Sequence, residues 1–419
     1  MTGLLVGLFV ATAAISITTN RDVFSPTKFY LVNFVVFFGA AFTGSASDEV
    51  CALSMLVLAM GTVAALMERG APPVPAYRQG TLSLRDQPQA TTWIWILTAG
   101  PILGQSFLIQ RSGGFYSFVG GYGSRVLEWQ GAGWATTLMM TVGTLNLCYL
   151  AVGLVRRRTI AWWSGFFAHL AITLFIVGLS GSRSAVLGTL VLHLITIHYM
   201  RRRVSIASAS ALGLVFVASA LSLGSARERV GELLENGLSS VDIAALKSDS
   251  FAYGTAPLQL ILDADPMPMA FGTTFLSALT NPVPRSWWPG KFDSGGIFLT
   301  KSYADDAWGG ASNMTPTFLG EWVINFGWVV GIAGYITSAS LLAWMLARGY
   351  RGLLRAIREP RSVDRALDVA LYVCLMWSVV GLMVGEVTNV FLSFLLHRVA
   401  PIAAIRFACR VWPGGQPRS

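Results

Sequence analysis

The side chains best suited to chemistry are arginines and carboxylates in segments that separate long apolar blocks. In chain order, the candidates are Arg183, Arg227, Arg229, Arg285, Lys291, Tyr303, Asp305, Asp306 and Glu321. The planar fork of an arginine binds phosphate through two N–H donors, and a carboxylate can take a proton from a sugar hydroxyl. Together they fit transfer from a phosphate-linked donor, in which arginines stabilise the charge that builds on the leaving phosphate. These segments show no metal-ligand spacing of His, Asp or Cys.

The composition indicates the environment in which these residues work. Of the 419 residues, 54% are hydrophobic and only 12% are charged, whereas soluble domains carry about 25% charged residues. The apolar residues form continuous blocks, and about 20 such residues cross a bilayer as a helix. Backbone groups find no other partners in lipid, so we expect an all-α integral membrane protein. The net charge of +9 then reflects membrane topology and not nucleic-acid binding.

Apolar blocks predict about eleven transmembrane helices in one polytopic domain, 1–419. The predicted spans lie near 1–19, 29–45, 51–67, 92–110, 133–155, 161–180, 184–200, 204–223, 320–346, 367–385 and 387–405. Arginine-rich connections then fall on one side, including the basic loop 347–366, and positive charge gathers in cytoplasmic loops. We therefore expect the N-terminus outside, the C-terminus inside and a long external loop at 224–319.

The external loop is expected to contain interfacial helices. Apolar residues recur at helical spacing after Ala226, within 226–241, as in a helix that lies along a membrane surface. A second apolar stretch lies around 258–262, and prolines disfavour a helix through 282–291. A glycine- and aromatic-rich external segment, 113–125, has two readings: a stacking surface for sugars, or an irregular interfacial loop.

Several residues have an ordinary structural interpretation as well as a functional one. Glu321 stands where the dipole at a helix N-terminus favours a carboxylate, and Arg227 and Arg229 suit the surface of a helix. Arg398 falls inside the last predicted span, either as a functional residue or, as we favour, with its side chain extended to the interface. The histidines of the predicted spans and the four cysteines are expected to be packing residues.

Three motifs in order resemble the bacterial Wzy-type polymerases of oligosaccharide repeat units, which make O-antigen or capsule. They are Gly-Ser-Arg-Ser-Ala at 181–185, Pro-Arg-Ser-Trp-Trp-Pro-Gly-Lys at 284–291, and Thr-Pro-Thr-Phe-Leu-Gly-Glu-Trp-Val-Ile-Asn-Phe-Gly at 315–327. The resemblance covers roughly 175–345. Two positions depart from the pattern: Val323 replaces an aromatic residue, and Phe292-Asp293 follows Lys291 where proline is expected.

The resemblance implies a GT-C-like, metal-independent inverting glycosyltransferase of the bacterial inner membrane, without a cofactor. Its donor and acceptor would be repeat units linked to undecaprenyl pyrophosphate, and a chain-length regulator is an expected partner. Arg183 and Arg285 would bind pyrophosphate, helped by Arg227 or Arg229. Glu321 would be the base, with Asp305 or Asp306 as alternatives, and Lys291 and Tyr303 would line the acceptor groove. An O-antigen ligase is the nearest alternative, and a polysaccharide flippase a more distant one.

Overall fold

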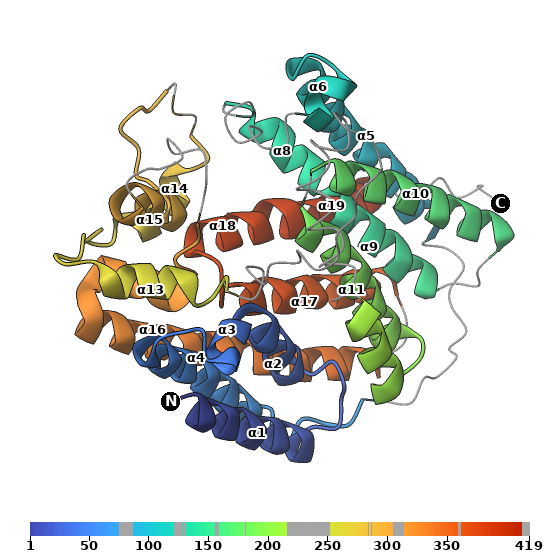
Figure 1. Ribbon diagram of the computed structural model, residues 1–419. Helices are drawn as coiled ribbons and strands as arrows, with labels where there is room; N and C mark the ends of the chain where they lie inside the picture. Colours follow the sequence, from blue (N-terminus) through green and yellow to red (C-terminus); the bar gives the residue numbers. More distant parts are fainter. Residues whose placement is uncertain are drawn as a thin grey trace, which may run out of the picture. The chain divides into compact units, whose positions relative to one another are not determined.

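A computed structural model describes most of the chain, and Figure 1 shows its helices. The described residues are 1–74, 87–120, 129, 131–155, 159–180, 182–215, 252–283, 285, 287–304, 314–358 and 362–412. All regular structure in these ranges is helical. Seven helical segments are long and apolar enough to cross a membrane: Thr2–Thr19, Asp48–Met67, Gln89–Arg111, Gly133–Leu154, Ile160–Leu179, Thr317–Ala356 and Val387–Val411.

These seven segments coincide with seven of the predicted spans. The predicted span 29–45 forms two shorter helices, α2 (Pro26–Phe37) and α3 (Gly39–Thr43), and 184–200 forms α11 (Arg183–Met200). The span 367–385 corresponds to α17 (Val363–Gly381), whose first turns carry charged residues. Only the part of 204–223 up to residue 215 is described, as helix at 206–215. A total of eleven spans therefore stays a prediction.

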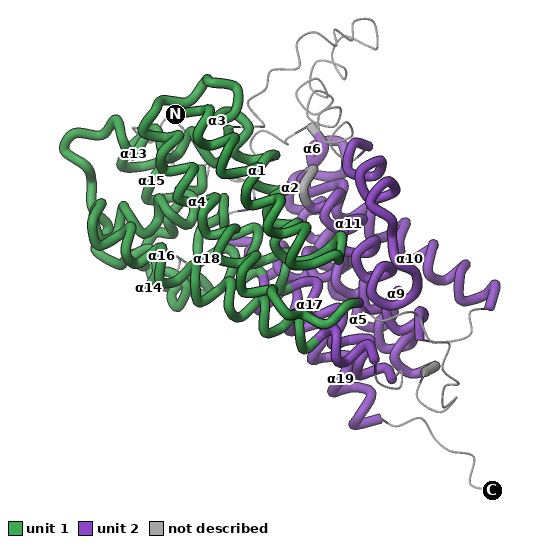
Figure 2. The backbone as a smooth tube through the Cα atoms, turned by 90° about the horizontal axis from the view of Figure 1, so that it is seen from below, with its two compact units in different colours: residues 1–73, 247–352, 375–393 green, residues 74–246, 353–374, 394–419 purple. Residues whose placement is uncertain are grey.

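The helices group into two compact units, coloured separately in Figure 2. Unit 1 contains Met1–Pro73, Lys247–Gly352 and Leu375–Ser393, and unit 2 contains Val74–Leu246, Leu353–Cys374 and Phe394–Ser419. Each unit combines segments that are distant in the sequence. The residues of the candidate site described below belong to unit 1.

One end of unit 1, the Met1 end, carries the N-terminus and the described part of the predicted external loop. The amino group of Met1, at the start of α1 (Thr2–Thr19), lies 3.3 Å from Asp48 at the start of α4 (Asp48–Met67). Ser47 donates a hydrogen bond of 2.8 Å to Gln259 on α13 (Ala256–Asp263). The N-terminus of α1, the N-terminus of α4 and α13 therefore share this end.

The opposite end of unit 1, the Glu68 end, is closed by a buried polar cluster. The Glu68 carboxylate accepts two hydrogen bonds of 2.7 Å from Thr27, and one of 3.0 Å from Asn20. Tyr350 donates to Asp22 at 2.7 Å, and the Arg351 guanidinium donates to the carbonyl of Met67 at 2.9 Å. Arg351 and α13, a described part of the predicted external loop, thus lie at opposite ends of unit 1, in agreement with their predicted separation.

The helix α16 (Thr317–Ala356) reverses direction at Gly327, whose φ of 74° and ψ of 178° are non-helical. Trp322 and Gly331 would lie about 13 Å apart along a straight helix. A methyl group on Gly331 would instead meet the carbonyl oxygen of Trp322 at 2.7 Å, and one on Gly334 would meet the Trp322 ring at 2.3 Å. A short arm, 317–326, therefore folds back on a long arm, 328–356.

This reversal corrects the predicted span 320–346. The motif at 315–327 does not enter a crossing helix directly; Glu321 lies in the short arm. At about 1.5 Å per residue the short arm is roughly 15 Å long, too short to cross a bilayer. The long apolar helix begins after Gly327, because only glycine readily adopts that backbone conformation.

Unit 2 packs α5 (Gln87–Arg111), α8 (Gly133–Met140), α9 (Val142–Leu154), α10 (Ile160–Leu179), α11 and α19 (Ala400–Val411). The last predicted span includes a π-helical turn, Ser393–Val399. Within it, Arg398 donates a hydrogen bond of 2.9 Å to Thr144 on α9. The Arg398 side chain thus contacts α9 of unit 2, and its position relative to the membrane interface stays a prediction.

Candidate functional site

The candidate site is a buried pair of carboxylates in unit 1, Glu321 and Glu386. Four elements meet there: α14 (Thr273–Thr280), the first turn of α15 (Gly295–Tyr303), the short arm of α16, and the start of α18 (Val387–Leu392). The short arm rests on α13, since a methyl group on Gly320 would lie 2.9 Å from Ile261. The site therefore belongs to the Met1 end.

Glu321 is completely buried, and both of its carboxylate oxygens accept hydrogen bonds. Oε1 accepts from the Thr274 hydroxyl at 3.0 Å, and Oε2 accepts from the backbone N–H of Val387 at 2.6 Å. Val387 is the first residue of α18, so Glu321 satisfies a donor that has no partner within that helix. In this conformation, Glu321 joins the short arm of α16 to α14 and α18.

Glu386 is also completely buried and immediately precedes α18. Its Oε2 accepts from the backbone N–H of Gly296 in the first turn of α15. Its Oε1 is buried and has no hydrogen-bond partner among the described residues. Burial raises the pKa of the Glu386 carboxyl, and the hydrogen bonds from the Gly296 N–H and the Ser294 hydroxyl offset part of that rise. Glu386 thus keeps an oxygen that can accept a proton or a ligand hydroxyl.

Amide and hydroxyl groups fix the surroundings of the two carboxylates. The Asn325 side chain donates to Thr274 Oγ1 and to the carbonyl of Glu321, both at 2.6 Å, and accepts from the N–H of Gly272 at 2.8 Å. Thr388 donates to the carbonyl of Thr274 at 3.0 Å and lies 2.6 Å from the Ser277 hydroxyl. The glutamate and the asparagine of the predicted motif 315–327 therefore serve one network.

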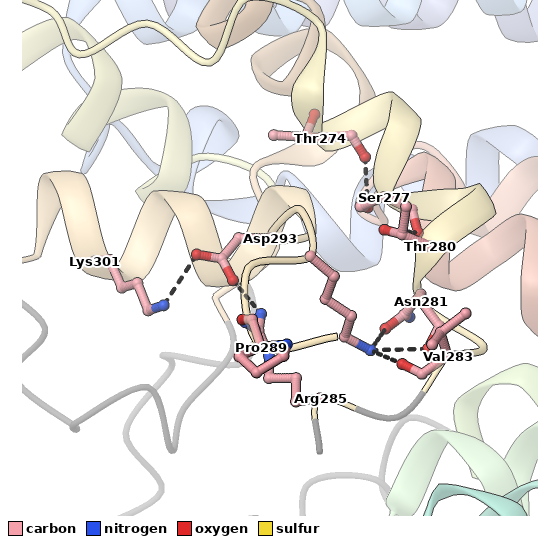
Figure 3. A network of polar contacts seen from close by, with 10 residues as sticks. Thr274, Ser277, Thr280, Asn281, Val283, Arg285, Pro289, Asp293 and Lys301 are labelled. Carbon is pink, nitrogen blue, oxygen red and sulfur yellow. Dashed lines mark hydrogen bonds and ion pairs between the residues drawn. The ribbon is translucent and has the colours of Figure 1, made fainter. Parts of the chain in front are cut away.

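The loop between α14 and α15 carries the predicted cations (Figure 3). Arg285 forms an ion pair with Asp293, and Lys301 on α15 lies 2.9 Å from the same carboxylate. The loop carries two positive charges, from Arg285 and Lys291, and Lys301 on α15 adds a third near the single negative charge of Asp293. Asp293 belongs to the dipeptide that departs from the family pattern, and here it is the counter-ion of Arg285.

Lys291 and Tyr303, predicted to line an acceptor groove, hold the loop in place in this conformation. The Lys291 ammonium donates to the carbonyls of Asn281 at 2.9 Å and Val283 at 2.7 Å. Its pKa is lowered by partial burial and by the nearby Arg285. The Tyr303 hydroxyl donates to the carbonyl of Pro268 at 2.6 Å, and burial raises its pKa to about 12. Their role toward a substrate stays a prediction.

The other predicted site residues cannot be compared with the structure. Arg227, Arg229, Asp305 and Asp306 lie outside the described residues. Arg183 is the first residue of α11 in unit 2, but its side chain is not among those described. Of the predicted catalytic residues, Arg285 and Glu321 are therefore the two whose side chains can be placed, and both belong to unit 1.

Sequence reasoning missed Glu386. It stands alone between two apolar blocks, in Gly-Leu-Met-Val-Gly-Glu-Val-Thr at 381–388, and the predicted spans left it as a one-residue connection. A carboxylate flanked on both sides by apolar blocks was the available signal. Its importance appears only when the fold brings it beside Glu321, which is distant in the sequence.

A second buried polar network lies in unit 2. His169 on α10 is 2.8 Å from Thr98 on α5 and 2.9 Å from Asn146 on α9, and Asn146 is 2.7 Å from His193 on α11. This fits the packing role predicted for the histidines of the spans. Cys51, Cys148 and Cys374 are buried free thiols, also as predicted.

Comparison of the chain with models of protein families, with curated proteins and with solved structures finds no match. The assignment of a function therefore depends on the residues and their geometry.

Proposed function

We propose that this protein is a polymerase of lipid-linked oligosaccharide repeat units at the external face of the bacterial inner membrane. A hydroxyl oxygen of the incoming unit attacks the anomeric carbon of the growing glycan. The bond from that carbon to the phosphate oxygen breaks, and undecaprenyl pyrophosphate leaves with the electron pair. A carboxylate takes the proton of the hydroxyl. A single displacement of this kind inverts the anomeric centre.

One observation supports this proposal most directly: two motifs that carry the family resemblance belong to one polar assembly. The loop with Arg285 connects α14 to α15. The same two helices contact the buried carboxylates, through Thr274 on Glu321 and through Gly296 on Glu386. A cationic loop joined to a carboxylate pair has the two groups that the reaction needs, a phosphate ligand and a base.

Arg285 is the described residue best suited to the leaving pyrophosphate. Its side chain is 45% exposed, and its present partners are the Asp293 carboxylate, which is shared with Lys301, and the carbonyl of Pro289 at 3.4 Å. A pyrophosphate has more negative charge than Asp293 and accepts the guanidinium through two oxygens. We therefore assign Arg285 to the leaving group, with Lys291 near it. Arg183, Arg227 and Arg229 remain proposed phosphate ligands, and Asp305 and Asp306 remain candidates for the base.

The test is a reconstituted polymerisation by the purified protein. Given synthetic lipid-pyrophosphate-linked repeat units, it is expected to make a ladder of products without nucleotide. Loss of one group that stabilises transition-state charge lowers kcat by about 100-fold or more, which we expect for Arg285→Ala. Arg285→Lys keeps the charge but not the fork, and we expect an intermediate rate. Arg202→Ala, an exposed arginine of unit 2, is the matched control.

Two results would contradict the proposal: wild-type protein that makes no ladder, or Arg285→Ala that matches Arg202→Ala. Gene deletion separates the polymerase from a ligase that uses the same donor. Cells without a polymerase keep single repeat units on the lipid core, whereas cells without a ligase carry none.

A further inference from the structure

We propose that Glu386 is the catalytic base, and that Glu321 is the residue that positions it. This inference rests on the proposed function and goes beyond it, because it assigns the proton transfer to a residue outside the motifs that carry the family resemblance.

The first step concerns the free acceptor positions of the two carboxylates. Both oxygens of Glu321 accept hydrogen bonds from the protein, from Thr274 and from Val387. The Glu386 carboxylate accepts from Gly296 through Oε2 and interacts with the Ser294 hydroxyl, while its buried Oε1 makes no hydrogen bond of regular geometry with the described part of the chain. A base must offer a lone pair to the proton that it removes. A carboxylate oxygen has two lone pairs. Oε1 of Glu386 keeps both of them for a substrate proton, whereas each oxygen of Glu321 already uses one for a hydrogen bond to the protein.

The second step excludes the ordinary role of an acidic residue that precedes a helix. Such a residue normally accepts a hydrogen bond from an N–H of the first turn. The Glu386 side chain makes no capping hydrogen bond to α18. Glu321 instead accepts from Val387, the first N–H of that helix. Glu386 instead satisfies an N–H at the start of α15 through Oε2, and that structural role leaves its buried Oε1 unused.

The third step concerns electrostatics. Glu321 and Glu386 are close enough to interact electrostatically, and burial together with this interaction outweighs the hydrogen bonds that favour the charged form of Glu321. A neighbouring negative charge and burial both make a carboxylate hold its proton more firmly. Burial raises the pKa of Glu386, which brings it closer to the pH at which a general base works best.

The fourth step concerns access. The first turn of α15 covers Glu386, because Gly296 donates to its carboxylate. This turn begins with Gly295-Gly296 and follows directly on the loop that carries Arg285 and Asp293. When a pyrophosphate replaces Asp293 as the partner of Arg285, the Arg285–Asp293 ion pair breaks. The loop and this turn are then held less firmly. Movement of the turn then opens Glu386 to the acceptor hydroxyl, whose proton passes to Oε1.

The experiment measures initial rates of polymerisation against pH for purified full-length protein in lipid nanodiscs. For the wild type, the rate is expected to fall as the pH falls through the raised pKa of the base, because the protonated carboxyl accepts no proton. Glu386→Gln is expected to lower the rate by about 100-fold or more and to abolish this acid limb. Glu321→Gln is expected to lower the rate but keep the limb, since Glu386 is still present.

Glu49→Gln, an exposed acid in the first turn of α4, is the control and should match the wild type. If Glu386→Gln is not monodisperse, Glu386→Asp replaces it, with a lower rate and a displaced acid limb expected. The assignment is overturned if either variant keeps the wild-type rate and profile, or if the limb disappears in Glu321→Gln instead. Wild-type protein without activity would overturn the proposed function and, with it, this role. An active wild type with an unaffected Glu386 variant would overturn this role alone.

Discussion

At the residue scale, the Glu321 carboxylate depends on the absence of a side chain at Gly295. A methyl group there would lie 2.9 Å from Glu321 Oε1 and 3.1 Å from Pro316. We expect Gly295→Ala to displace the first turn of α15 and to weaken polymerisation markedly, since overpacking of this kind costs about 1–3 kcal/mol. The initial rate of ladder formation, with the melting temperature of the purified protein, checks this expectation.

Gly290 provides the matched control, because it lies in the loop that leads to α15 and a methyl group there meets nothing within 4 Å. Gly290→Ala should therefore leave the rate close to that of the wild type. Equal rates for the two alanine variants would show that the contact at Gly295 is unimportant.

The sequence predicted part of the site at this scale. It selected Glu321 and Arg285 through their motifs, and both belong to the polar assembly of unit 1. It did not predict that both Glu321 oxygens would accept hydrogen bonds, because Thr274 and Val387 are distant in the sequence from Glu321 and from each other. Glu386 was missed for the same reason: a single carboxylate between apolar blocks has no partner until the chain is folded.

At the element scale, the reversal in α16 depends on one backbone conformation. The φ of 74° and ψ of 178° at Gly327 lie in a region that essentially only glycine occupies, and such strain costs about 1–3 kcal/mol for other residues. We expect Gly327→Ala to lower the melting temperature and to reduce activity, because the short arm carries Glu321. The melting temperature in detergent and the rate of ladder formation measure both effects.

Gly352 lies on the same helix and is the control for helix propensity. It has helical backbone geometry and open space around it, so Gly352→Ala should stabilise the protein or leave it unchanged, by up to about 1 kcal/mol. A Gly327→Ala variant as stable and active as Gly352→Ala would mean that the reversal is not needed for the site.

The polar network of unit 2 makes a separate prediction about helix packing. Asn146 lies between His169 and His193, so Asn146→Ala removes a partner from two buried rings on two other helices. A buried polar group left without a partner costs about 1–3 kcal/mol. We expect a lower melting temperature for Asn146→Ala than for Asn33→Ala, whose side chain bonds within its own helix, to the carbonyl of Phe29. Identical melting curves would contradict this.

Hydropathy alone predicted the elements well where a block of apolar residues forms one continuous helix. It placed α1, α4, α5 and α10 within a few residues. It failed at α16, because the apolar composition continues through 320–346 and contains no proline to indicate a break. Gly327 was the only local signal, and a glycine within an apolar block does not by itself reveal a reversal. The role of Gly331 and Gly334 becomes clear only in the fold, where both lie against Trp322.

At the scale of the whole molecule, the arginine-rich connections and the polar motifs were predicted to lie on opposite sides of a membrane. Unit 1 agrees with this separation: α13 shares an end with Met1, and Arg351 lies at the Glu68 end. The sequence could predict that the arginine-rich connections share one side, because loops rich in positive charge are retained in the cytoplasm. Which of these two ends faces the cytoplasm is a question for labelling in cells.

Labelling of single cysteines in intact cells decides that question. The background replaces Cys409, which is partly exposed, by serine and keeps the buried Cys51, Cys148 and Cys374. Trp287 is 81% exposed in the loop beside Arg285, and we expect Trp287→Cys to react with a membrane-impermeant maleimide added outside the cells. Arg69→Cys, at the exposed turn next to Glu68, should react only after the membrane is permeabilised.

The reverse pattern would place the cationic loop and the carboxylate pair in the cytoplasm. Both the activity and the assignment of Glu386 would then fail, because lipid-linked repeat units are polymerised on the outer face in the proposed reaction. The two positions belong to opposite ends of one compact unit, so their labelling reports the orientation of that unit whatever the total number of spans. The experiment therefore tests the physical premise of the proposal, that arginine and carboxylate meet a departing lipid pyrophosphate outside the cytoplasm.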